Sequence, residues 1–493
     1  MSKPNRAFPL FFPALLLILQ FFNNAAGQEI EILIRLGPNG LPLADVTGKF
    51  DPNDAPKSVR NLSFARSEAG VENLASRISE VRALDSGGSN IGLRKLMDGE
   101  YLAEKPIAAW SYVVELSPAK PHGATAHVSW VEGDTGVLML DDLLPHEVTK
   151  IQKMDIGVPP GWSVLASSSI MQMGSPAAGS RTMVIPIGKG WRERAITFGT
   201  AGIKLRFSGE WLFTDEEAEA IAGEIFQHYR ELFDSEPSPT SQIVIAKLQG
   251  SSGPGLWEAE TRGRTIMIIS GDMNFRTQSI QRLHEQLRHE MFHLWLPNGV
   301  NLKGNYDWFY EGFALYQSLK TGVVLNRIRF DDFLETLSRA YEIDVSIAQK
   351  RSLIDASAKR WSDGDTQVYA RGMIVAFLCD LALLDKSGGK RGVADIEREI
   401  FQKYKAPAME ADGNEAVLSI LREHAELLPL LDKYVTGADP IDWTAQLRLA
   451  GIESTGEGRH TNLKVVAKPA GRQKTLLDKL GYNSWRKLAG SSK

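Results

Sequence analysis

The segment His284–Tyr316, HEQLRHEMFHLWLPNGVNLKGNYDWFYEGFALY, contains two predicted helices separated by a short connection. In the first helix, His289, Glu290 and His293 form an H-E-x-x-H motif. Residues four apart lie one above the other on the same face of a helix, so both imidazoles can reach a single metal ion. Glu290 is offset by one position, where a carboxylate can take a proton from a metal-bound water. The motif therefore predicts a hydrolytic metal site.

A third metal ligand is predicted on the second helix. Glu311, within WFYEGFALY, follows His293 by eighteen positions. Zinc in hydrolases commonly takes two histidines and one glutamate and keeps its fourth position for water. The competing interpretation is a solvated helix face with two unrelated histidines. We favour one Zn²⁺ per chain, bound by His289, His293 and Glu311, because the helix around the motif is amphipathic. Its apolar face comprises Leu283, Leu287, Phe292 and Leu296.

The same segment resembles the gluzincin metallopeptidases, and most closely the glycyl aminopeptidase family, which is related to the alanyl and leucyl aminopeptidases. HEMFHLW is similar to the zinc-binding helix of that family, and WFYEGFALY is similar to its glutamate-bearing helix. YARGMIVAFLCDLAL resembles a later helix that begins Tyr-x-Lys/Arg-Gly. The resemblance extends from about Phe207 to Gly389. The PDZ-type module of the family is not recognisable in this sequence.

The resemblance implies a thermolysin-like catalytic domain that hydrolyses peptide bonds, with Glu290 activating the water. It also implies that Tyr369, at the start of the later helix, donates a hydrogen bond to the oxyanion of the tetrahedral intermediate. A lone tyrosine at the start of a helix is otherwise a packing residue or a surface hydroxyl. Arg371 takes the place of the commoner lysine, and we expect it to have a structural or ion-pair role.

Substrate binding is expected in GPGLWEAET, Gly253–Thr261. Related aminopeptidases bind the substrate backbone and its amino group with a glycine-rich segment that carries a glutamate. The resemblance points to Gly255 and Glu258, with Glu260 as a close competitor, because a buried ammonium ion needs a nearby carboxylate. A glutamate in a surface loop is the plainer alternative. We therefore expect an aminopeptidase acting on unblocked peptides, with an endopeptidase and a catalytically idle peptide-binding relative as alternatives.

Two departures from the family leave the side-chain preference open. The gap between His293 and Glu311 is shorter than the glycyl aminopeptidases usually have and is nearer to that of the alanyl and leucyl group. LPNGVNLKGN replaces the basic stretch that normally follows the zinc-binding helix.

The sequence pattern divides the chain into regions and predicts an α+β fold. Residues 28–207 contain short apolar runs separated by turn-forming residues, which predict a β-rich amino-terminal domain built as a β-sandwich or a saddle-shaped sheet. Thr214 and Glu217 form a capping box that begins a helix, and residues 208–440 are expected to form a thermolysin-like, mainly helical catalytic domain. Residues 441–493 have weaker periodicity and are expected to be a carboxy-terminal tail of unclear structure.

Composition excludes several classes of protein. The chain has 493 residues, of which 43% are hydrophobic and 24% charged, as in ordinary globular proteins. Its 56 basic and 60 acidic residues give a formal charge of −4, which argues against a nucleic-acid partner. The partner that the resemblance implies is a peptide substrate. Cys379 is the only cysteine, so intramolecular disulfides, thiolate zinc sites and iron–sulfur clusters are excluded.

Residues 1–27 have the pattern of a secretory signal peptide. Lys3 and Arg6 precede the apolar stretch Leu10–Phe22, and small residues follow it. We expect export to the periplasm or the exterior, without stable membrane insertion after the signal is removed. An uncleaved membrane anchor is the alternative, although Pro13 and Gln20 interrupt the apolar stretch. The sequence does not predict an oligomeric state.

Overall fold

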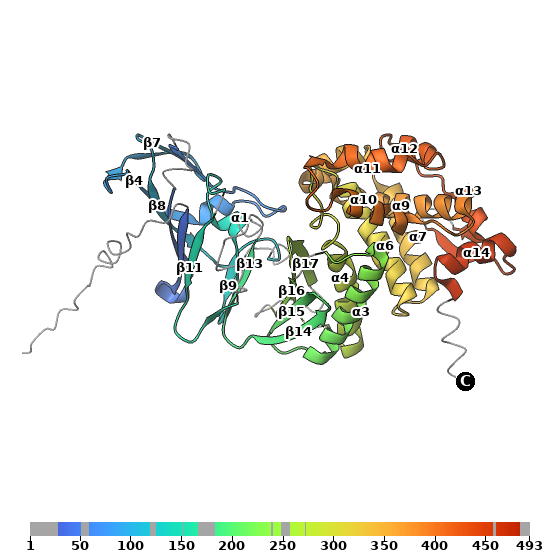
Figure 1. The fold of residues 1–493 in the computed structure, drawn as a ribbon, viewed down its shortest axis with the longest axis horizontal. Coiled ribbons are helices and arrows are strands. Elements are labelled where there is room, and N and C mark those ends of the chain that lie inside the picture. The colour runs from blue at the N-terminus through green and yellow to red at the C-terminus, as the bar shows by residue number, and fades with distance from the viewer. Residues whose placement is uncertain are drawn as a thin grey trace, which may run out of the picture.

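The computed structural model describes residues 28–50, 59–118, 125–149, 151–165, 183–237, 240–247, 257–271, 273–456 and 460–483. In these residues the fold is α+β, with sheets in the amino-terminal half and mostly helices in the carboxy-terminal half, as predicted. Figure 1 shows the sheets on the left and in the centre and the helices on the right. The predicted signal peptide, residues 1–27, and Gly255 lie outside the described residues.

Three sheets form the amino-terminal domain. The outer sheet contains, in spatial order, β11 (Lys153–Gly157), β1 (Glu29–Leu36), β2 (Pro42–Lys49), β8 (Ala109–Glu115), β4 (Ile78–Leu84) and β5 (Asn90–Ile91). The second sheet contains β12 (Ser163–Val164), β13 (Val184–Gly188), β10 (Thr135–Met139) and β9 (Trp130–Glu132). The third contains β3 (Asn61–Ser63), β7 (Glu100–Ala103) and β6 (Leu93–Met97). The short helix α1 (Leu140–Leu143) follows β10.

The outer and second sheets pack face to face, because alternate residues of their strands enter one core. In β1, Ile30 and Ile32 are buried in this core, and from the second sheet Leu138 and Ile185 join them. Side chains on a strand alternate between its two faces, so such a pattern buries one face of each sheet against the other. The packing corresponds to the predicted sandwich.

The sheet of the catalytic domain begins earlier than predicted. Its strands, in spatial order, are β14 (Arg192–Phe198), β15 (Ala201–Ser208), β16 (Thr240–Lys247), β18 (Thr265–Ser270) and β17 (Trp257–Arg262). β15 pairs in parallel with β16, and β14 pairs with β15. The boundary predicted between residues 207 and 208 is therefore wrong, and it lies before Arg192. The alternation of β14 and β15 indicates strands but does not indicate which sheet they join.

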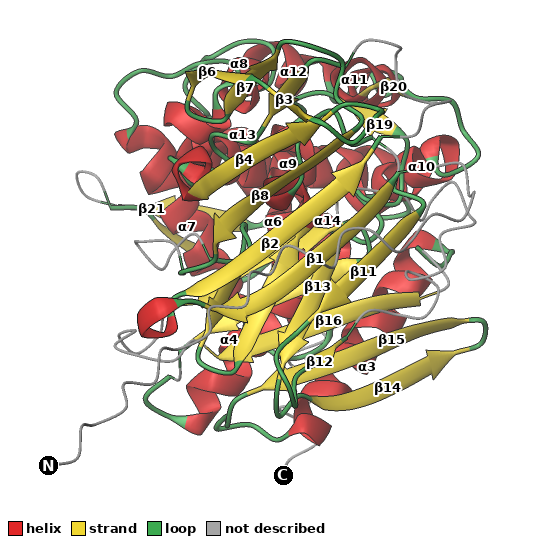
Figure 2. Ribbon diagram, turned by 90° about the vertical axis from the view of Figure 1, so that its left-hand side faces the viewer, coloured by secondary structure: helices red, strands yellow, loops and turns green. Residues whose placement is uncertain are grey.

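Both faces of the catalytic sheet are covered. On β16, Ile243 and Ile245 point into the helical core, whereas Val244 and Ala246 pack against the second sheet of the amino-terminal domain, in a cluster that includes Val137. The layers therefore run from the outer sheet through the second sheet and the catalytic sheet to the helices. Figure 2 shows the sheets in front of most of the helices.

The helices form one large core with the catalytic sheet. They are α3 (Asp215–Phe233), α4 (Arg276–Phe292), α5 (Asp307–Tyr310), α6 (Gly312–Val324), α7 (Phe330–Ser346), α8 (Leu353–Ala358), α9 (Asp365–Ser387), α10 (Val393–Tyr404), α11 (Gly413–Arg422), α12 (Leu428–Tyr434), α13 (Thr444–Ala450) and α14 (Gly471–Lys479). Two short strand pairs accompany them, β19 (Leu302–Lys303) with β20 (Ala411–Asp412) and β21 (Ile452–Thr455) with β22 (Asn462–Val465). The capping box of Thr214 and Glu217 begins α3, as predicted. α4 ends at Phe292, so Leu296, which the sequence assigns to the apolar face of the predicted helix, lies beyond its end.

The carboxy-terminal residues up to 483 belong to this core. Trp443, Leu447, Leu463 and Leu477 are buried in the same cluster as the residues of α9. One described stretch, Arg360–Ser387, is long and apolar enough to cross a membrane, but 89% of its apolar window is buried inside the protein. Its hydrophobicity is therefore that of a central core helix.

Two glycines let α6 and α9 cross at backbone contact distance. A Cβ on Gly372 would lie 2.9 Å from the Cα of Gly312 and 2.9 Å from the carbonyl oxygen of Trp308. A Cβ on Gly312 would lie 2.5 Å from the Cα of Gly372. Backbone atoms cannot yield as a flexible side chain can, so only glycine fits at both positions.

We predict that Gly372→Ala destabilises the protein by about 1–3 kcal/mol, the usual cost of overpacking a core. Chemical denaturation of the variant and the wild type measures the change in the free energy of unfolding. Gly223→Ala is the matched control, because its nearest neighbour would be 3.7 Å away, within α3. That substitution should stabilise the protein by about 0.4–1 kcal/mol. Equal effects of the two substitutions would contradict the packing argument.

Candidate metal centre and cleft

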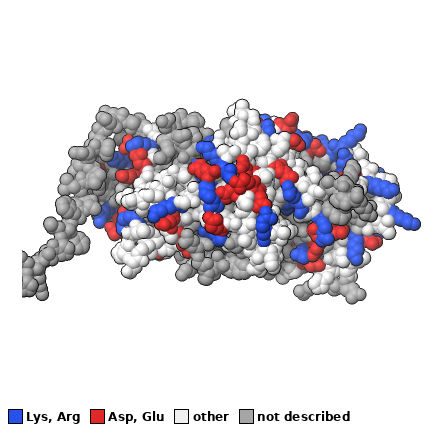
Figure 3. Space-filling view, turned by 90° about the horizontal axis from the view of Figure 1, so that it is seen from below, with Lys and Arg blue, Asp and Glu red and all other residues white. Residues whose placement is uncertain are grey.

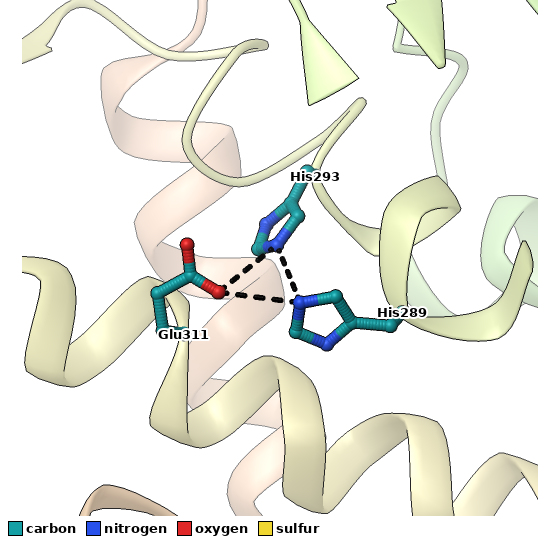
Figure 4. A group of neighbouring side chains, drawn as sticks. All are labelled: His289, His293 and Glu311. Atoms are coloured by element: carbon teal, nitrogen blue, oxygen red, sulfur yellow. Dashed lines mark hydrogen bonds and ion pairs between the residues drawn. The ribbon is translucent and has the colours of Figure 1, made fainter. Parts of the chain in front are cut away.

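His289, His293 and Glu311 converge on one point. The Nε2 atoms of the two histidines lie 3.1 Å apart. Oε2 of Glu311 lies 3.2 Å from Nε2 of His289 and 3.4 Å from Nε2 of His293. Figure 4 shows the three side chains pointing toward one another. This arrangement is one that can hold a metal ion, and it brings together all three predicted ligands.

The hydrogen bonding around these atoms fits a metal ion. Nδ1 of His293 lies 3.0 Å from the carbonyl oxygen of Leu296 and donates to it, so its Nε2 carries the free electron pair. Oε2 of Glu311 is buried and has no hydrogen-bond donor among the described residues. Two imidazole nitrogens and one carboxylate oxygen are a donor set of catalytic zinc sites.

Local structure explains how the ligands meet. Leu283, Leu287 and Met291 bury one face of α4 in the core, which leaves His289 on the opposite side. His293 follows the last residue of α4 and caps that helix. Glu311 lies between α5 and α6, directly before the glycine at which α6 crosses α9.

Glu290 lies in a buried, hydrogen-bonded position beside the predicted ligands. Its exposed fraction is 4%. The hydroxyl of Thr261 on β17 lies 2.8 Å from Oε2 of Glu290 and 2.8 Å from its carbonyl oxygen. Burial raises the pKa of the Glu290 carboxyl, although the neighbouring His289 and His293 lower it. A raised pKa suits a group that takes up and releases a proton. No motif marks Thr261 in the sequence, although it ends the GPGLWEAET segment.

A cleft of about 460 Å³ contains the site. His289, Glu290, His293, Glu311 and Tyr369, the five residues predicted from the helical motifs, all line it. Further charged or aromatic residues that line it are His127, Glu260, Asp307, Tyr310, Arg360, Trp361 and Asp365. His127 belongs to the amino-terminal domain, so both domains form the cleft.

Tyr369 is the fifth residue of α9 and lines the cleft. Its ring centroid is 6.5 Å from that of His289, and its hydroxyl oxygen accepts a hydrogen bond of 2.6 Å from Nη2 of Arg360. Arg371 is fully buried and forms an ion pair of 3.4 Å with Asp344, which agrees with the expected structural role.

Only one of the two candidate glutamates on the edge strand β17 lines the cleft. Ala259, Glu260 and Thr261 line the cleft, whereas Glu258 is not among its lining residues. Oε2 of Glu258 instead lies 3.5 Å from the backbone nitrogen of Ala126. The structure thus brings Glu260, rather than the predicted Glu258, to the described cleft.

Glu260 is held by two basic side chains. One oxygen of its carboxylate accepts a hydrogen bond of 2.9 Å from Nε of Arg262, and the other contacts Nδ1 of His127. Burial raises the pKa of the Glu260 carboxyl, but Arg262 and His127 outweigh it and hold the pKa below its usual value. Glu260 is therefore ionised, and it lines the same cleft as the predicted metal ligands.

Two further cavities adjoin the cleft. One of about 390 Å³ shares Ala259, His289, Glu290 and Tyr369 with it. The other, a groove of about 1130 Å³ between the amino-terminal domain and the turn before α9, shares residues 360, 361 and 365. The cleft therefore adjoins each cavity at a different part of its lining.

The surface gives no sign of a nucleic-acid interface on the face that Figure 3 shows. Among the described residues of that face, basic and acidic side chains are interspersed. A phosphate backbone is bound by clustered basic side chains, which this face does not present.

No protein-family model matches the sequence, and no curated protein matches it. Solved structures do match the fold. An aminopeptidase N family protein from Idiomarina loihiensis has a TM-score of 0.71 and 15% identity, over 87% of this chain and 79% of that chain. A mutant M1 zinc metallopeptidase from Deinococcus radiodurans, bound to a Tyr-Ser-Ala substrate, has a TM-score of 0.51 and 13% identity, over 85% of this chain and 96% of that chain. The chain thus has the fold of the aminopeptidase N-type M1 zinc metallopeptidases.

Proposed function

We propose that this protein is a zinc-dependent aminopeptidase that removes residues from unblocked peptides. The observation that carries the proposal is the convergence of two imidazole nitrogens and a carboxylate oxygen, with Glu290 beside them and an edge strand along the cleft. A bound Zn²⁺ would polarise the peptide carbonyl and make a water acidic enough to be deprotonated near neutral pH. His289, His293 and Glu311 would hold this ion.

Glu290 and Tyr369 supply the remaining chemistry. The Glu290 carboxylate accepts the proton of the attacking water and delivers it to the leaving amine, and Thr261 orients that carboxylate. Tyr369 donates its hydroxyl hydrogen to the oxygen on which negative charge develops. Both groups line the same cleft as the metal ligands.

The peptide is expected to bind as an added strand along β17. This strand is the edge of the catalytic sheet and pairs only with β18 among the described strands. An edge strand presents unpaired backbone donors and acceptors, which an extended peptide can use. The binding mode explains why β17 residues line the cleft.

Glu260 is the proposed anchor of the peptide ammonium group, in place of Glu258. Arg262 lies within 3.4 Å of three carboxylates, those of Glu260, Glu68 and Asp141. Three carboxylates against the guanidinium of Arg262 and the imidazole of His127 leave excess negative charge, which suits an incoming ammonium ion. His127 contacts the same carboxylate and would be displaced by the ammonium group or share the carboxylate with it.

An endopeptidase is the second candidate, and the groove beyond Trp361 favours it. An aminopeptidase needs a closed end beside the ammonium site, whereas this groove continues the cleft past Arg360 and Trp361. A catalytically idle peptide-binding protein is a third candidate, which peptide hydrolysis by the purified protein would exclude.

We also propose export to the periplasm or the exterior, because residues 1–27 have the pattern of a signal peptide. Fractionation of producing cells, with sequencing of the mature amino terminus, tests this. An uncleaved membrane-bound chain would support the anchor alternative.

We predict that the purified protein carries about one zinc ion per chain and that His293→Ala loses it, because removal of one of three protein ligands opens the site. Metal analysis after dialysis measures the content. His460→Ala is the control, since His460 is exposed and distant in sequence from the ligands. Undiminished zinc in His293→Ala would contradict the ligand assignment.

We predict that Glu290→Gln retains the fold and the zinc but loses about 10²- to 10⁴-fold in kcat, the usual contribution of positioned acid–base catalysis. An amide cannot accept the proton of the water. Steady-state kinetics with an aminoacyl substrate, together with metal analysis, provide the measurement. A near wild-type rate would exclude Glu290 as the base.

We predict a preference for free over acetylated peptides that depends on Glu260. Acetylation removes the ammonium charge and leaves the half-buried carboxylate without that partner, a penalty of about 2–5 kcal/mol. Glu260→Gln should therefore reduce the ratio of kcat/KM for free and acetylated peptides. Glu258→Gln is the matched control on the same strand and should leave the ratio unchanged. Efficient cleavage inside a long, acetylated peptide would identify an endopeptidase.

A further inference from the structure

Arg360 lies next to the metal ligands, although no motif in the sequence marks it. It begins a π-helical turn, Arg360–Gly364, that joins α8 to α9. Its side chain is only 10% exposed and lines the cleft. π-helical turns are uncommon and occur frequently at functional sites.

The guanidinium contacts both Glu311 and Tyr369. Nη1 lies 3.0 Å from Oε1 of Glu311, and Nη2 donates a hydrogen bond of 2.6 Å to the hydroxyl oxygen of Tyr369. One side chain therefore connects a predicted metal ligand with the predicted oxyanion donor.

The bond to Tyr369 has only one possible direction. A guanidinium has five N–H donors and no acceptor, so the Tyr369 oxygen must accept. The phenolic hydrogen is then available for another partner in the cleft. A nearby cation also favours negative charge on a substrate oxygen to which that hydrogen donates.

The contact with Glu311 distinguishes the two oxygens of its carboxylate. Arg360 holds Oε1, whereas Oε2 faces the imidazoles of His289 and His293 and has no hydrogen-bond donor in the part of the chain that the structure describes. The carboxylate therefore presents one defined oxygen to the metal position. Partners that orient a ligand in this way commonly tune metal affinity.

Three neighbours hold Arg360 in place. Nη1 lies 2.9 Å from Oδ1 of Asp307, Nε lies 3.4 Å from Oδ1 of Asp365, and the guanidinium lies 4.4 Å from the ring centroid of Trp361. Ion pairs on two sides and an aromatic face restrict the planar group to one orientation.

We propose that Arg360 is a positioning residue that orients Glu311 toward the metal and Tyr369 toward the oxyanion. The proposal deepens the proposed function and depends on it. A purely structural Arg360 would change stability alone, so the test needs measurements that stability does not affect.

The first measurement is zinc affinity, determined by competition with a chelator on the purified protein. Arg360→Lys keeps the charge but loses the planar fork, and it should weaken zinc binding by about 10- to 100-fold. Arg351→Lys is the matched control, because Arg351 pairs with Asp363 of the same turn and does not line the cleft. The control should retain wild-type zinc affinity, and wild-type affinity in Arg360→Lys would contradict the proposal.

The second measurement is a double-mutant cycle at saturating zinc. Arg360→Lys should lower kcat by about 10- to 100-fold with little change in KM. In a Tyr369→Phe background, Arg360→Lys should lower kcat by less than about threefold, because the hydroxyl that Arg360 positions is already absent. Equal losses in the two backgrounds would contradict the coupling.

Two controls complete the test. If Arg360→Lys fails to fold, Arg360→Gln is measured against the same criteria. A wild-type protein that binds no zinc, or that cleaves no peptide, contradicts the proposed function itself. Zinc binding and cleavage by the wild type without the Arg360 effects contradict the positioning role alone.

Discussion

The backbone contact between Gly312 and Gly372 is the constraint on which the site depends. Glu311 directly precedes the first glycine, and Tyr369 lies one helical turn before the second. A single helix crossing therefore brings a predicted metal ligand and a predicted oxyanion donor to the same cleft. Arg288 on α4 donates a hydrogen bond of 2.9 Å to a carbonyl of α6, which attaches the histidine-bearing helix to the same unit. The core around these contacts is close-packed, and it therefore fixes the distances among the three predicted ligands.

The layered sheets explain why the amino-terminal domain takes part in the cleft. The second sheet packs on the catalytic sheet through residues such as Val137 and Val244, so the two domains share an apolar interface. That interface brings His127 to the carboxylate of Glu260 on the edge strand. The groove between the domains then adjoins the cleft at Trp361. The amino-terminal domain thus contributes to the shape and charge of the site, beyond supporting the fold.

Two arginines form ion pairs with the carboxylates in and beside the cleft. Arg360 lies against Asp307, Glu311 and Asp365, and Arg262 lies against Glu260 and two further carboxylates. A buried carboxylate without a partner is costly, so several can be placed together only around fixed cations. Burial opposes ionisation of Glu311, but His293 and Arg360 keep the pKa of its carboxyl well below the usual range. It therefore remains an anionic ligand group.

The sequence by itself determined the α+β order and predicted His289, His293 and Glu311 as a group, which the fold brings together. Helical spacing places the two histidines on one face, and Glu311 follows on the next predicted helix. The sequence could not decide between Glu258 and Glu260. Residues two apart on a strand share a face, so only the placement of the strand against the cleft shows which of the two lines it. Arg360, the sheet that β14 and β15 join, and the packing of the carboxy-terminal residues also depended on tertiary structure. Local periodicity shows which face of an element is apolar, whereas the partner of that face is chosen by contacts between segments far apart in the chain.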